Sequence, residues 1–153
     1  MIQRIQSLYL LLITILTVLT LFLPLGGALF NNVSYEATVF GMKTLASPPE
    51  TVYSSLPLAG LTLLIALIAF ITIFLYKNRK RQILLSNINS FLIVLFYALL
   101  AYYLSSFKEQ AEEMPFQMKI AIAFPLIDLV LYYLAVRKIK ADEALIRSLN
   151  RLR

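Results

Sequence analysis

Four hydrophobic runs, each long enough to cross a lipid bilayer as a helix, dominate this 153-residue chain. A transmembrane helix needs roughly 17–25 mostly apolar residues, and the runs cover residues 7–25, 57–76, 83–104 and 118–136. Apolar residues make up 60% of the chain and charged residues 14%, against roughly 45–50% and about 25% in soluble domains. A chain this short cannot hide that much apolar surface from water, so we expect lipid to surround most of it.

The residues around the runs predict where each span ends. Pro24, Gly26 and Gly27 close the first run, and Pro57 suits the first turn of the second, where no N–H is needed. The first run is longer than the roughly 7–15-residue core of a signal peptide, so we expect an uncleaved anchor. The chain is then one integral membrane domain, residues 1–153, with outer loops 26–56 and 105–117, a cytoplasmic loop 77–82 and a cytoplasmic tail 137–153.

The distribution of lysine and arginine predicts the orientation. With four spans, both termini share one side with the middle loop, and that side holds eleven basic residues against three on the other. Basic residues concentrate in cytoplasmic loops, so we expect both termini in the cytoplasm. The eleven are Arg4, Lys77, Arg79, Lys80, Arg81, Arg137, Lys138, Lys140, Arg147, Arg151 and Arg153, and the three are Lys43, Lys108 and Lys119.

Two segments outside the spans have patterns of their own. Residues 32–40 alternate, with Val33, Tyr35, Ala37 and Val39 on one face, which is typical of a half-exposed strand. A turn at Gly41 and a second short strand at residues 51–53 would complete a small hairpin over the outer end of the helices. The tail from residue 140 reads as a short amphipathic helix with an apolar stripe of Leu145, Ile146, Leu149 and Leu152.

These patterns predict an all-α membrane protein: a four-transmembrane-helix bundle with a small β-hairpin-like outer loop and a C-terminal amphipathic cytoplasmic helix. That last helix has two interpretations. It either lies on anionic lipid headgroups, or it docks onto a membrane-protein partner or a second copy of the chain. In both, the contact residues are Leu145, Leu149, Arg147, Arg151 and Arg153.

Asp128 is the only ionisable residue expected deep in the bilayer. An acid there costs roughly 2.5–3.5 kcal/mol on insertion scales, so it should face the protein interior. The third span places a polar cluster of Ser86, Asn87, Asn89 and Ser90 at a similar depth, so contacts from Asn89 or Ser90 to Asp128 are reachable. Thr14 lies at a similar depth, and Tyr132 follows Asp128 on the same helix face.

Pro125 is expected to kink or loosen the fourth span, because it removes the hydrogen bond to the Ala121 carbonyl. A kinked span with one acid suits a proton or cation relay, but equally a structural hydrogen-bond clamp between helices. We favour the clamp, since one acid without a second titratable group makes poor transport machinery. In the second span, a stripe of small residues predicts close helix packing: Ala59, Thr62, Ala66 and Ala69.

The composition excludes several kinds of chemistry. Histidine and cysteine are both absent, which rules out Cys/His zinc sites, thiolate catalysis and histidine-based triads. We therefore expect no metal site and no cofactor. We also expect no nucleic-acid partner, because the basic residues mark orientation and attraction to anionic lipid. The chain is therefore predicted not to be an enzyme, the one exception being a lipid-modifying enzyme with a sparse site.

The chain opens with MIQRIQSLYLLL and ends with DEALIRSLNRLR. In these two motifs it resembles an uncharacterised family of small four-span bacterial membrane proteins, domain-of-unknown-function family 4293. The resemblance covers the whole chain and implies an inner-membrane protein of a Gram-negative bacterium. It implies no known activity and no catalytic residues.

The leading functional hypothesis is a non-enzymatic accessory or scaffold subunit of a larger membrane complex, or a small homo-oligomer. It rests on the shortage of reactive groups beside two substantial elements outside the membrane. The alternative is a small transporter or channel that uses Asp128 as an intramembrane proton or cation site.

Overall fold

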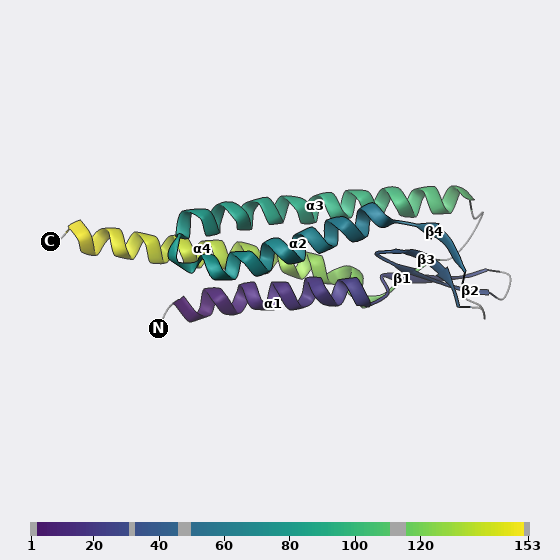
Figure 1. Cartoon of the computed structure of the whole chain (residues 1–153), viewed down its shortest axis with the longest axis horizontal. Coiled ribbons are helices and arrows are strands. Elements are labelled where there is room, and N and C mark those ends of the chain that lie inside the picture. The colour runs from purple at the N-terminus through teal and green to yellow at the C-terminus, as the bar shows by residue number, and fades with distance from the viewer. Residues whose placement is uncertain (1–2, 31–32, 46–49, 111–115, 152–153) are drawn as a thin grey trace.

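The structure is a computed structural model that describes residues 3–30, 33–45, 50–110 and 116–151. Four long helices run alongside one another, and a small antiparallel sheet sits at one end of them (Figure 1). Both chain termini lie at the opposite end (Figure 1). The sheet and the termini are therefore separated by the full length of the helices.

The helices are α1 (Gln3–Phe22), α2 (Leu56–Phe74), α3 (Arg79–Gln110) and α4 (Phe124–Arg151). All four are long and apolar enough to cross a membrane. They pack in chain order, α1 on α2, α2 on α3 and α3 on α4, and α4 returns to pack on α1. Their shared core contains the fully buried Leu10, Ile65, Phe96 and Tyr132, one from each helix.

Short 3₁₀ segments and prolines define how the helices begin and end. Pro57 lies in the first turn of α2, as expected. The segment η1 (Leu75–Lys77) and Asn78 form the whole connection from α2 to α3, so the turn is tighter than the expected loop. The stripe of small residues on α2 is buried, as its spacing predicts.

The prediction that Pro125 kinks the interior of the fourth span was wrong. Pro125 is the second residue of α4, which follows the 3₁₀ segment η2 (Ile120–Ala123). The Ala121 carbonyl that proline would leave without a donor accepts the Phe124 N–H instead. Proline in a first helical turn removes no hydrogen bond, so α4 can begin there without a break in its ladder.

The outer loop forms more sheet than the expected hairpin. The strands are β1 (Gly26–Phe30), β2 (Val33–Thr38), β3 (Gly41–Thr44), β4 (Thr51–Ser54) and β5 (Phe116–Met118), in the order β4-β3-β2-β1-β5. The two strands predicted at 32–40 and 51–53 correspond to β2 and β4, and Asn32 lies outside the described residues. The expected alternation is absent, because every residue of β2 is half-buried.

Gly26 explains why β5, which comes from the second outer loop, can pair with β1. A Cβ atom on Gly26 would overlap the ring of Phe116 and lie 2.9 Å from the Gln117 carbonyl oxygen. The glycine that looked like the end of a helix is instead a position where two strands approach too closely for any side chain. The two outer loops are thereby joined into one sheet.

The sheet is fixed to the helices by the turn between β2 and β3. Val39 in this turn is fully buried in the helical core. Ser55, just before α2, donates its hydroxyl hydrogen to the Val39 carbonyl (2.9 Å) and its N–H to the Phe40 carbonyl (3.1 Å). Lys119, just after β5, forms an ion pair with Glu36 of β2 (2.8 Å).

The C-terminal tail is not a separate helix. α4 continues without a break for 28 residues to Arg151, and its last turns project past the ends of the other helices (Figure 1). The tail thus extends along the axis of the fourth span, a geometry that does not suit a helix lying flat on a membrane surface.

Replacing Gly26 by alanine should lower the free energy of unfolding by about 1–3 kcal/mol, because the added methyl group overpacks the β1–β5 contact. Thermal unfolding in detergent micelles measures the change. Gly60→Ala on α2 is the matched control, since nothing lies within 4 Å of the added Cβ atom, and it should be neutral or slightly stabilising. Equal losses in the two variants would contradict this role for Gly26.

Candidate functional site

Asp128 lies on α4 in the interior of the helical region and is fully buried. Its carboxyl oxygen Oδ2 lies 2.9 Å from the hydroxyl oxygen of Thr17 on α1. The same hydroxyl lies 2.8 Å from the backbone carbonyl oxygen of Ile13, one turn earlier on α1. Asp128 therefore connects the last helix of the chain to the first.

The hydrogen count at this contact indicates which form of the acid fits. The Thr17 hydroxyl has one hydrogen and two acceptors within reach. A charged carboxylate can only accept, so it would compete with the Ile13 carbonyl, whereas a protonated carboxyl can donate to Thr17 while Thr17 donates to Ile13. The other oxygen of Asp128, Oδ1, is buried without a hydrogen-bond partner among the described residues. Both features favour a neutral acid that acts as a clamp.

Asn89 forms a second junction, between three helices. Its side-chain amide on α3 donates to the Ile65 carbonyl of α2 (3.0 Å) and to the hydroxyl of Tyr132 on α4. Asn89 and Tyr132 are both fully buried. Tyr132 follows Asp128 by one helical turn, so one face of α4 carries the contacts to α1 and to α3.

A third junction lies near the other end of the contact between α1 and α4, which we call the α1–α4 seam. The side-chain amide of Gln6 on α1 donates to the carboxylate of Asp142 on α4, and both side chains are buried. A separate tail helix was expected to begin at residue 140, but Asp142 lies well inside α4. The seam between the two helices farthest apart in sequence thus has a buried acid contact near each end.

The structure separates the polar residues that the sequence placed together. Neither Asn89 nor Ser90 bonds to Asp128: Ser90 donates to the Ser86 carbonyl of its own helix (2.9 Å), and Asn87 is exposed on the outside of α3. Thr14 bonds to the Leu10 carbonyl of its own helix (2.9 Å).

Sequence reasoning missed Thr17 and Gln6 as partners of acids. One signal could have found them: Gln6, Leu10, Ile13, Thr17 and Thr20 recur at intervals of three and four, and all five are buried. This is the inward face of α1. Depth alone pointed to Thr14, which lies one turn away and off that face.

The predicted contact residues of the tail fall largely outside what the structure describes. Leu145 is 55% exposed on α4. The backbone of α4 includes Arg147, Leu149 and Arg151, but their side chains are outside the described part of the chain, and Arg153 is outside it altogether.

The interactions that the structure shows between the buried polar side chains of different helices are hydrogen bonds. Within the described ranges, no three acidic side chains are grouped so that they could hold a metal ion. A small apolar cavity lies under the sheet, and a groove lies between α3 and α4. Asp128 lines neither of them. Its surroundings are those of a packed, hydrogen-bonded core, which is the arrangement that we expect for a structural clamp.

The comparison with protein families gives one match. The model of a family described as "Domain of unknown function (DUF4293)" matches residues 2–152. No curated protein matches the chain.

Replacing Thr17 by valine should lower the free energy of unfolding by about 1–3 kcal/mol, because it keeps the shape but leaves the buried carboxyl of Asp128 without a partner. Unfolding in mixed detergent micelles measures the loss. Thr20→Val is the control: Thr20 is also buried on α1, but among the described residues its hydroxyl bonds to the Leu16 carbonyl of its own helix and to no other helix. A loss as large in the Thr20 variant would contradict the clamp.

Proposed function

The chain belongs to the DUF4293 family. We propose that it is a non-enzymatic multi-pass protein of the bacterial cytoplasmic membrane. In this proposal it serves as an accessory or scaffold subunit of a larger membrane assembly, or it forms a small homo-oligomer. Four helices long and apolar enough to cross a membrane support the multi-pass part of this proposal. The excess of basic residues at the end that carries both termini supports their cytoplasmic location.

The observation that carries the assembly role is the projecting end of α4. Its last turns extend past the ends of α1, α2 and α3, so these described helices do not cover them (Figure 1). Its described apolar residue, Leu145, is 55% exposed, and an exposed apolar position on such a helix is typical of a surface that binds another helix.

The interior supports a structural role more than a transport role. Asp128 is the residue on which the alternative of a transporter or channel depends. Its carboxyl is buried, within hydrogen-bond distance of Thr17, and placed where it closes α4 onto α1. These are the properties of a group that holds helices together, and they favour the accessory subunit over ion handling.

The test is purification of the full-length tagged chain from its native membranes in mild detergent. We expect a stoichiometric partner or a defined oligomer, and we expect Leu145→Glu to reduce its recovery several-fold, because the charge interrupts the apolar stripe. Ala144→Glu is the matched control: Ala144 is also exposed, and it lies about 120° around the helix from the centre of the stripe. This variant should retain the assembly.

Recovery of the unaltered chain as a lone monomer, under conditions that preserve other membrane complexes, would overturn the proposed function. Equal loss of assembly in the two glutamate variants would remove the role of the α4 stripe.

A further inference from the structure

A groove of about 570 Å³ runs along the outside of the helical region between α3 and α4. Asn87 and Ser90 line it from α3. Its α4 side combines Arg137 and Lys140 with a surface of Leu129, Tyr133 and Val136. Unlike the buried core, this groove is open to whatever surrounds the helices.

The groove changes from cationic to apolar along its length. Lys140 and Arg137 lie toward the tail, and Leu129 lies near the start of α4. At 1.5 Å per residue, the eleven steps from Leu129 to Lys140 span about 16 Å. That is roughly half of the 30 Å hydrocarbon core of a bilayer, so the groove has the length of one leaflet with its charged end at the headgroup level.

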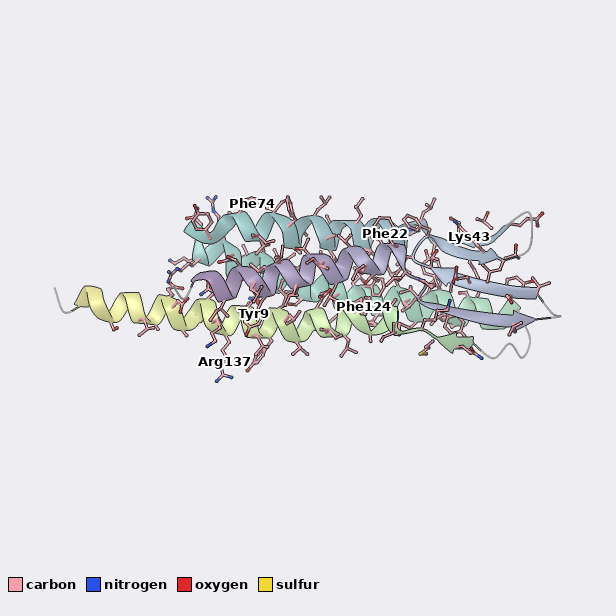
Figure 2. All side chains as sticks on the ribbon, turned by 90° about the horizontal axis from the view of Figure 1, so that it is seen from below. Tyr9, Phe22, Lys43, Phe74, Phe124 and Arg137 are labelled. Carbon is pink, nitrogen blue, oxygen red and sulfur yellow. The ribbon has the colours of Figure 1, made fainter. Side chains whose placement is uncertain are left out.

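No acidic residue in the described part of the chain neutralises the two cations at the charged end. Arg137 and Lys140 are both exposed, and neither forms an ion pair with another described residue. Figure 2 shows the Arg137 side chain pointing outward from α4, near the end of the helices opposite the sheet. One turn apart, the two residues can approach a single phosphate from one helix face.

The polar residues on the α3 side lie deeper than the cations. Asn87 is exposed, and its amide makes no hydrogen bond to another described residue. An amide facing hydrocarbon without a partner is costly, so a ligand that brings oxygen atoms to this depth would be favoured. The hydroxyl of half-buried Ser90 adds a second polar group about 4.5 Å further along α3.

We propose that the α3/α4 groove binds one anionic phospholipid from the leaflet on the side of the termini. The lipid phosphate lies between Arg137 and Lys140, and one of its ester oxygens accepts a hydrogen bond from the Asn87 amide. One acyl chain follows the surface of Leu129 and Val136 beside the Tyr133 ring. Charge complementarity selects an anionic headgroup, and the matching order of cationic, polar and apolar residues selects a lipid molecule over a free anion. This site is independent of the assembly role.

Native mass spectrometry of the full-length chain in detergent tests the site, with dioleoyl phosphatidylglycerol and dioleoyl phosphatidylcholine as probes. We expect one phosphatidylglycerol to bind at least ten-fold more tightly than phosphatidylcholine. Arg137→Ala with Lys140→Ala should weaken phosphatidylglycerol binding by about 10- to 30-fold. The control is Arg81→Ala with Lys138→Ala, an equal loss of charge from exposed residues on other faces of α3 and α4, and it should retain binding.

A second pair of variants separates the groove from a merely cationic surface. Val136→Trp fills the groove and should block both lipids with the cations intact. Val18→Trp adds the same bulk on the outward face of α1, where Val18 is 37% exposed, and should change nothing. Four results would each overturn the proposal. Two are equal binding of the two lipids and equal losses in the two alanine pairs. The others are displacement of the lipid by millimolar inorganic phosphate and a groove occupied by a second copy of the chain.

Discussion

The structure depends on the solvent that its helices face. Large apolar side chains cover the outside of all four helices, including Leu8, Phe70, Phe91 and Val130, each at least half exposed. In water such a surface would associate or collapse. In lipid it is already in a favourable environment, so burying it between helices gives little driving force.

Other interactions must therefore hold the helices together. Small residues on α2 allow close approach, and three buried polar contacts join elements that are distant in sequence. Thr17 and Gln6 of α1 contact the two buried acids of α4, Asp128 and Asp142, while Asn89 joins α3 to α2 and α4. The contacts from Thr17 and Gln6 explain why the first and last helices pack together along their length. The sheet also links these two helices, but only at one end, through β1 after α1 and β5 before α4. Buried polar groups of this kind specify partner and register more than they add stability.

The sequence was sufficient to predict the features that depend on composition and period. The four apolar helices, the place of Pro57 in the first turn of α2 and the burial of the α2 stripe follow from length, proline geometry and residue size. The strands β1 and β5 could not be predicted in this way. β5 has three residues, too few to show a period, and Gly26 with Gly27 has low intrinsic strand propensity. Only the approach of Phe116 to Gly26 shows why glycine is needed there.

The partners of Asp128 were harder to predict for a different reason. Depth along a helix follows from residue count, but the choice between Thr14 and Thr17 depends on rotation about the helix axis. That rotation is set by the whole inward face of α1, from Gln6 to Thr20. The tail raises a similar difficulty: a change of composition at Lys140 suggested a new element, although nothing in residues 137–142 interrupts the backbone hydrogen bonds of α4.

The central claim is that lipid surrounds the helices and that the sheet and the tail lie on opposite sides of the membrane. The chain has no cysteine, so single cysteines can report on this through a membrane-impermeant maleimide in intact spheroplasts. Lys43→Cys on β3 should react at once, Lys138→Cys only after permeabilisation, and Phe91→Cys in neither condition. Ready labelling of Phe91→Cys, or labelling of Lys43→Cys and Lys138→Cys from the same side, would contradict the account.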